Sequence, residues 1–160
     1  MKNKHLSVWG IGPVYVSIIL ITTFILVIIN KKLPFYSFPI PMVSIIIGII
    51  LIFIGISLWI SAVVFSKITS EIKSNRLVTN GIFAYVRNPI YSAFMFICSG
   101  IIILLNNVIL FVVPLLYWLF LTILMIKTEE KWLKNIYKQE YIEYCKKVNR
   151  CIPKLKNNMK

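Results

Sequence analysis

Two short polar clusters carry the side chains in this chain that could do chemistry. They are Arg87-Asn88-Pro89-Ile90-Tyr91 and Glu129-Glu130. Together they supply a guanidinium, an amide, a phenol and two carboxylates. An arginine can hold a carboxylate in a bidentate fork, and a glutamate can hold an ammonium group, so the set suits a zwitterionic ligand. Charged groups beside long apolar runs are costly, which makes both clusters candidate functional sites.

The same clusters argue against hydrolytic machinery. The chain has one histidine, His5, far from either cluster, and no serine stands beside a base, so a nucleophile–histidine triad is unsupported. Neighbouring residues on a helix point about 100° apart. We therefore expect Glu129 and Glu130 to have different partners, unlike the facing carboxylates of a glycosidase. Tyrosines could stack on an aromatic ring or face a cationic sulfur, and the candidates are Tyr85, Tyr91 and Tyr141.

Composition and hydropathy predict an all-α membrane protein that forms a single domain over residues 1–160. Of the 160 residues, 59% are hydrophobic and only 14% are charged, a balance that a soluble domain does not have. Apolar runs at about residues 11–29, 42–65, 90–105 and 108–126 predict four transmembrane helices. Gly48 and Gly55 lie seven residues apart and permit close helix contact.

Two polar segments complete the predicted architecture. Residues 66–86 contain an Asn80-Gly81 turn signal and predict a short interfacial helix with a loop. Residues 127–147 show apolar positions at three- and four-residue spacing and predict an amphipathic, cytosolic C-terminal helix, followed by a tail over residues 148–160. We expect this helix to lie on the membrane or to fold back over the core.

The distribution of basic residues predicts the orientation in the cell membrane. The net charge is +13, and the basic residues gather at both ends and in residues 66–87. A multi-pass protein with both termini and both clusters in the cytosol follows. Basic flanks of this kind bind anionic membrane lipids. No fold that reads bases is visible, so nucleic acid is not an expected partner. Three cysteines without a paired spacing, with one distant histidine, predict no metal site.

The polar clusters also resemble a known family. The segment from Leu77 to Tyr91 resembles the Gly-x-(Tyr/Phe)-x-x-x-Arg-(His/Asn)-Pro-x-Tyr segment of the isoprenylcysteine carboxyl methyltransferase family. Glu129 to Leu133 resembles its Glu-Glu-x-x-Leu element. Its closing segment is matched by Glu140-Tyr141, Tyr144, Val148, Arg150 and Pro153. The resemblance covers about half the chain, and membrane phospholipid methyltransferases share this C-terminal plan.

The resemblance implies a membrane-embedded methyltransferase that uses S-adenosylmethionine. The methyl acceptor would be a lipophilic or prenylated molecule that enters from the bilayer, isoprenylcysteine-like or phospholipid-like. Arg87 and Glu130 are the implied catalytic residues. The implied cofactor-binding residues are Tyr85, Arg87, Asn88, Pro89, Tyr91, Gly100, Glu129, Glu130 and Tyr141.

Several positions depart from the family pattern. Met125 stands where an arginine usually precedes the glutamate pair, and Tyr137-Lys138 replaces a usual Phe-Gly. Ser92-Ala93 stands in place of a Gly-x-Gly of some phospholipid methyltransferases. Two other functions remain: a membrane reductase of related architecture that uses a nicotinamide cofactor, and a small transporter or membrane-complex subunit. A transporter predicts ionisable residues in mid-span, and the four apolar runs contain none.

Overall fold

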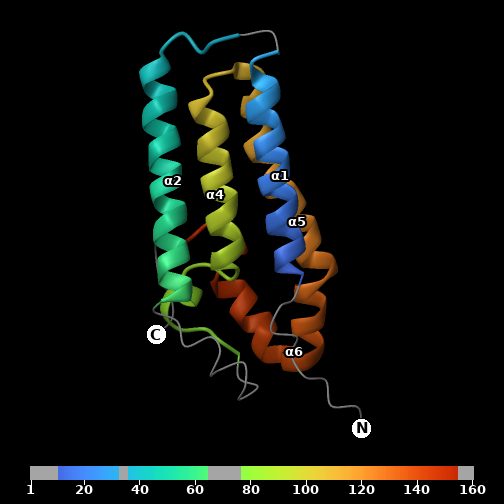
Figure 1. The fold of residues 1–160 in the computed structure, drawn as a ribbon. Helices are drawn as coiled ribbons and strands as arrows, with labels where there is room; N and C mark the ends of the chain where they lie inside the picture. Colours follow the sequence, from blue (N-terminus) through green and yellow to red (C-terminus); the bar gives the residue numbers. More distant parts are fainter. Residues whose placement is uncertain (1–10, 33–35, 65–76, 155–160) are drawn as a thin grey trace.

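The computed structural model describes residues 11–32, 36–64 and 77–154 and shows a helical bundle. Helices α1, α2, α4 and α5 stand side by side, and α6 lies beneath one end of them (Figure 1). The elements are α1 Gly12–Asn30, α2 Pro41–Val63, the 3-10 helix η1 Gly81–Ala84, α4 Pro89–Leu104, the 3-10 helix η2 Val108–Val112, α5 Val113–Lys127 and α6 Glu129–Lys147. Within the described ranges there is no β-strand, only two isolated bridges. The predicted all-α membrane fold is confirmed.

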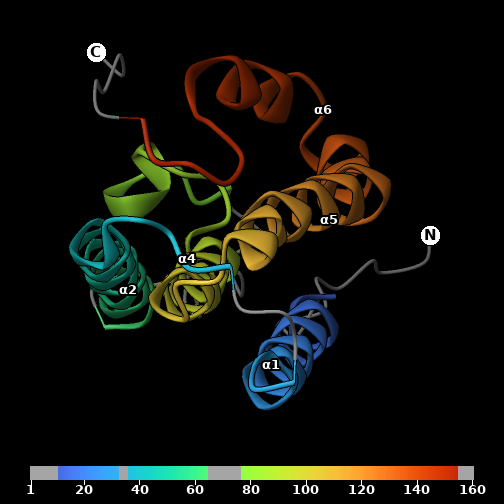
Figure 2. The same cartoon turned by 90° about the horizontal axis from the view of Figure 1, so that it is seen from above.

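Each upright helix begins with a proline in its first turn, where the missing N–H would have no helical partner in any case. Three stretches are long and apolar enough to cross a membrane: α1, α2 and residues 108–127. The fourth predicted span, α4, has 16 residues. At 1.5 Å per residue it is about 24 Å long, shorter than the roughly 30 Å of hydrocarbon. Accordingly α4 lies inside the bundle, between α2 and the pair α1 and α5 (Figure 2).

The predicted run at residues 108–126 is divided rather than continuous. Its first turn is η2, and regular α-helix starts only at Val113. Asn107 causes part of this change, because its side-chain oxygen accepts the Ile109 N–H at 3.2 Å. Pro114 adds to it, since it cannot donate the N–H that an α-helical turn would need.

Small residues allow α2 and α4 to approach closely. A Cβ placed on Gly48 would lie 2.6 Å from the Leu104 side chain, and one on Gly55 would lie 2.7 Å from the Ala93 carbonyl oxygen. From the facing helix, a Cβ on Gly100 would lie 2.6 Å from the Gly48 carbonyl oxygen. The close helix contact predicted for Gly48 and Gly55 is thus confirmed, and its partner is α4.

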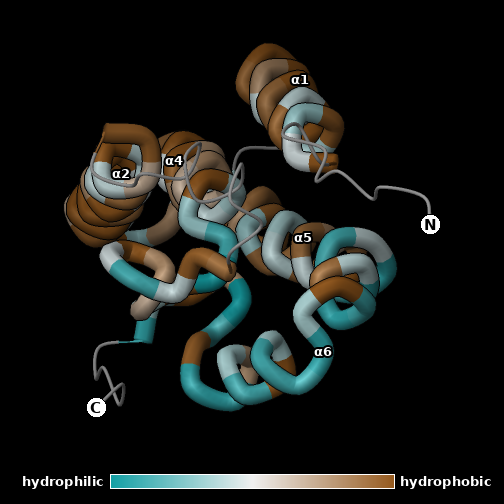
Figure 3. The backbone as a smooth tube through the Cα atoms, turned by 90° about the horizontal axis from the view of Figure 1, so that it is seen from below, coloured by the Kyte–Doolittle hydropathy of each residue, from teal (hydrophilic) through white to brown (hydrophobic). Residues whose placement is uncertain are grey.

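The C-terminal helix departs from prediction in being broken. α5 ends at Lys127, Thr128 has non-helical angles, and Lys138 interrupts α6 with φ 45° and ψ −118°. The polar α6 lies under the apolar spans (Figure 3), and its second half buries Tyr141 and Tyr144. It therefore folds back over the core, one of the two expected placements. Gly81 has φ 57° and forms the predicted turn. Much of the predicted interfacial helix, residues 65–76, lies outside the described residues.

Candidate functional site

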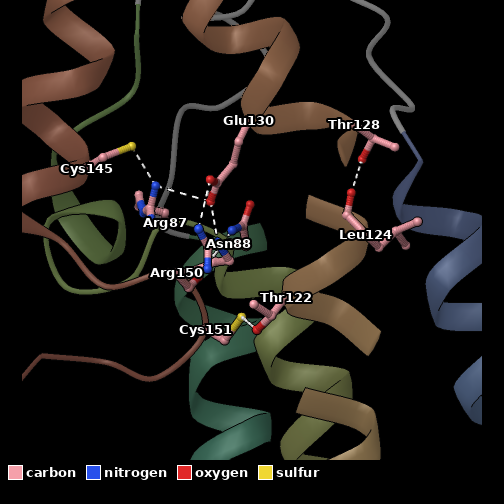
Figure 4. Close-up of polar contacts among 9 residues, drawn as sticks. All are labelled: Arg87, Asn88, Thr122, Leu124, Thr128, Glu130, Cys145, Arg150 and Cys151. Carbon is pink, nitrogen blue, oxygen red and sulfur yellow. Dashed lines mark hydrogen bonds and ion pairs between the residues drawn. The ribbon is translucent and has the colours of Figure 1, made fainter. Parts of the chain in front are cut away.

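A buried carboxylate held by two arginines forms the centre of the site (Figure 4). Glu130 is 3% exposed. Its Oε1 forms an ion pair with Arg87 Nη1 at 3.1 Å and accepts a hydrogen bond from Arg150 Nε at 2.5 Å, while its Oε2 accepts from Arg150 Nη2 at 3.0 Å. Arg150 thus binds in the two-pronged geometry that arginine and carboxylate prefer. The two predicted polar clusters meet at this carboxylate.

The chain after α6 positions Arg150 by running beside the segment that carries Arg87. The Arg87 N–H donates to the Asn149 carbonyl oxygen at 2.9 Å, and the Lys154 N–H donates to the Tyr85 carbonyl oxygen at 2.9 Å. Asn88 adds a side-chain bond, with Nδ2 donating to the Arg150 carbonyl oxygen at 3.2 Å. Both arginines are therefore held on parallel backbone before they reach the carboxylate.

Glu129 has a different set of partners, as its place on the helix predicts. Its Oε1 accepts from the Tyr91 hydroxyl at 2.9 Å and from the Ile11 N–H at 3.1 Å. The second bond caps the start of α1, which brings that helix against Tyr91; the Tyr15 and Tyr91 rings lie 6.3 Å apart, edge to face. Burial raises the pKa of the Glu129 carboxyl, and the bonds from Tyr91 and Ile11 offset only part of this shift.

The arginine cluster around Glu130 and the carboxylate of Glu129 carry opposite charges that their protein partners do not neutralise. The two arginines and Glu130 sum to one positive charge, and Arg87 Nε is buried without a hydrogen-bond partner. Glu129 has no cationic partner within the described part of the chain, where a phenol and a backbone amide donate to it. An anionic group would satisfy the first place, and a cationic group would satisfy the second.

Aromatic side chains of α6 line the arginine cluster. Tyr141 and Tyr144 are buried, with ring centroids 6.1 Å apart. Burial raises the pKa of both phenols, so they remain protonated, and the Tyr144 hydroxyl donates to the Phe83 carbonyl oxygen at 2.6 Å. Cys145 lies on the same face, and its Sγ accepts from Arg87 Nη1 at 2.5 Å. Tyr85 is 39% exposed.

The structure brings together most of the residues singled out in the sequence. Arg87, Asn88 and Glu130 share one cluster, Tyr91 and Glu129 form a second, and Pro89 is buried at the start of α4. Gly100 lies eleven residues further along α4, about 16 Å away at helical rise, and packs against α2.

Two contributors were not predicted from the sequence. In the sequence, Arg150 is only part of the closing segment of the resembled family, whereas in the structure it makes two bonds to Glu130. The start of α1 offered no sequence signal, because a backbone N–H supplies the contact with Glu129.

Comparison with known proteins identifies the family of this chain. A sequence model of a family described as phospholipid methyltransferase matches residues 43–140. The chain belongs to the phospholipid methyltransferase family. Its matched region runs from α2 to the first half of α6 and contains Arg87, Tyr91 and the glutamate pair. The helix α1 and Arg150 lie outside it.

A curated relative belongs by name to the isoprenylcysteine methyltransferases, which the sequence motifs also resemble. The chain is 41% identical over 85 residues to a protein-S-isoprenylcysteine O-methyltransferase of Schizosaccharomyces pombe. The aligned region covers 51% of this chain and 34% of that protein, so the chain spans about a third of the relative's length. No solved structure matches the chain.

Proposed function

We propose that this protein is a membrane methyltransferase that uses S-adenosylmethionine and transfers the methyl group to a lipophilic acceptor from the bilayer. The observation that carries the proposal is the pair of unmatched charges at Arg87 and Glu129, in a chain that belongs to a methyltransferase family. The methionine part of S-adenosylmethionine has one carboxylate and one ammonium group, which complement those two places.

The side chains at these two places complement the charges of that cofactor. Arg87 has a buried Nε with no partner, and guanidinium groups bind carboxylates strongly. Glu129 would hold the ammonium group, since its carboxylate accepts only neutral donors. The rings of Tyr141 and Tyr144 offer surfaces on which a purine ring or a sulfonium can lie. When bound, S-adenosylmethionine supplies an electrophilic methyl group on a positively charged sulfur.

The chain's own residues would orient the reaction rather than exchange protons. Glu130 holds Arg87 and Arg150 in place, and the tail that carries Arg150 fixes the backbone of Arg87. The second half of α6 covers the arginines and excludes water through Tyr141 and Tyr144. Holding two reactants in line can lower a barrier by about 7–11 kcal/mol. We therefore assign Arg87 and Glu130 to binding and orientation at the reaction centre.

We further propose that the acceptor is isoprenylcysteine-like or phospholipid-like. The relative's name favours the first and the family's description favours the second. Position 125, where the isoprenylcysteine enzymes resembled by this chain carry an arginine, holds Met125, which is 0% exposed in the apolar core. That position therefore contributes no charge to acceptor recognition here.

Calorimetry with S-adenosylmethionine and purified protein in detergent tests the cofactor assignment. We expect micromolar binding by the wild type. Arg87→Lys keeps the positive charge but loses the two-pronged hydrogen bonding of the guanidinium group. Glu129→Gln loses the negative charge but keeps the shape of the side chain. Each variant should weaken S-adenosylmethionine binding by about tenfold or more. The matched control is Glu143→Gln, an exposed carboxylate on the same helix, which should bind like the wild type.

Two results would contradict the proposal. The first is no binding by folded wild type in several detergents and lipids. The second is equal binding by wild type, Arg87→Lys and Glu129→Gln, which would mean that the clusters serve only folding or topology.

A further inference from the structure

Two hydroxyl groups in the membrane part of the bundle are buried without a hydrogen-bond partner. The Tyr15 hydroxyl on α1 and the Ser92 hydroxyl on α4 have no partner within the described ranges. Both residues are 0% exposed. A buried hydroxyl left unpaired costs about 1–3 kcal/mol. Groups of this kind need an explanation, and a polar atom of a ligand is one of the few available in an apolar interior.

Both hydroxyl-bearing residues lie next to the proposed site, on its bilayer side. The Tyr15 ring contacts Tyr91, which binds Glu129, and it belongs to the same buried core as Cys151. Cys151 directly follows Arg150 in the chain. Ser92 lies in the first turn of α4, and its N–H donates to the carbonyl oxygen of Asn88 at 3.0 Å. The Asn88 side chain in turn donates to the Arg150 carbonyl oxygen.

A second buried tyrosine of this core has a hydrogen-bond partner, which sets Tyr15 apart. The Tyr117 hydroxyl is 2.8 Å from Thr23 Oγ1, and that threonine also donates to the Ile19 carbonyl oxygen at 2.7 Å. Tyr15 and Tyr117 are both buried tyrosines of the same core. Only one of them has a protein partner within the described residues, so burial alone does not account for the unpaired Tyr15 hydroxyl.

We propose that the Tyr15 and Ser92 hydroxyls bind an anionic oxygen at the polar end of the methyl acceptor. This inference rests on the proposed function and names residues for its acceptor half. Tyr15 comes from α1, outside the region that matches the family, so α1 contributes to acceptor recognition in this chain. A hydroxyl pair can donate to the carboxylate of a prenylated cysteine or to the phosphate of a phospholipid, and the two sources share this oxygen chemistry.

Tyr15→Phe tests the inference because it removes one oxygen and keeps the ring. Acceptor binding is measured directly by calorimetry with N-acetyl-S-farnesylcysteine in one arm and with phosphatidylethanolamine in mixed micelles in the other. We expect the acceptor Kd to rise about five- to tenfold in one arm, the loss of one hydrogen bond. S-adenosylmethionine binding should stay within twofold of the wild type. Ser92→Ala should act in the same arm.

Tyr117→Phe is the matched control. It should lower the melting temperature, because its hydroxyl bonds to Thr23, and leave acceptor binding unchanged. Unchanged acceptor Kd in Tyr15→Phe and Ser92→Ala, in both arms, would overturn the inference. A lower melting temperature of Tyr15→Phe with unchanged acceptor binding would overturn it too, since the hydroxyl would then serve the fold through a buried water. Failure of the wild type to bind S-adenosylmethionine would instead count against the proposed function.

Discussion

The break in α6 at Lys138 predicts that the protein is more stable with glycine than with alanine at this position, the reverse of the usual order inside a helix. Lys138 is exposed and has φ 45° and ψ −118°. Side chains with a Cβ avoid this region, whereas glycine enters it freely. The break turns the second half of α6 back over η1, where the Tyr144 hydroxyl reaches the Phe83 carbonyl oxygen. The strained conformation is therefore held by contacts elsewhere.

The expected magnitude follows from two opposing contributions. Holding a residue with a Cβ in a sparsely populated backbone region costs about 1–3 kcal/mol. Glycine removes that cost but loses about 0.5–1 kcal/mol more than alanine in chain entropy. Lys138→Gly should therefore be more stable than Lys138→Ala by about 1 kcal/mol. In a regular helix the order is reversed, and glycine is less stable than alanine by about 0.8–1 kcal/mol.

Thermal unfolding in detergent, followed by circular dichroism, measures the comparison. At this chain length 1 kcal/mol corresponds to roughly 2–4 °C in Tm. The control pair is Lys134→Gly and Lys134→Ala, at an exposed position of the same helix with helical angles, where alanine should be the more stable. If alanine is more stable than glycine at both positions, the backbone at Lys138 is not strained and the reasoning is refuted.

Two further predictions concern Glu129 and Gly100. Burial raises the pKa of the Glu129 carboxyl, so the folded protein binds a proton at this carboxyl more tightly than the unfolded chain does. The free energy of unfolding should therefore fall as the pH rises from the ordinary carboxyl pKa through the raised pKa of the folded protein. Glu129→Gln should lose this slope in unfolding curves measured across pH, and parallel curves would contradict the assignment. Gly100→Ala should destabilise the bundle by about 1–3 kcal/mol, because its Cβ would meet the Gly48 carbonyl oxygen. We expect the affinity of the folded variant for S-adenosylmethionine to stay unchanged, and weaker binding would support the cofactor-binding role that the resemblance implies for Gly100.

Much of the helical plan could be predicted because hydropathy and proline act locally. Apolar runs of the right length and a proline in each first turn predict where the spans begin. The division at Val113 and the break at Lys138 could not be read from periodicity, because both leave the apolar pattern intact. One signal did exist for Lys138: it stands where the resembled family usually has glycine.

The candidate site was predictable in its parts but not in its pairing. Composition and spacing alone determined that an arginine segment and two glutamates flank a membrane hairpin on one face, and that adjacent glutamates point apart. Only the tertiary structure decided that Glu130 is shared by Arg87 and Arg150 and that Glu129 is left to a phenol and the start of α1. The physical reason is distance along the chain. Hydropathy and helix period act over a few turns. Arg150 instead reaches Glu130 with its side chain because Asn149 binds the backbone of Arg87, and Ile11 reaches Glu129 with its backbone N–H across 118 residues of sequence.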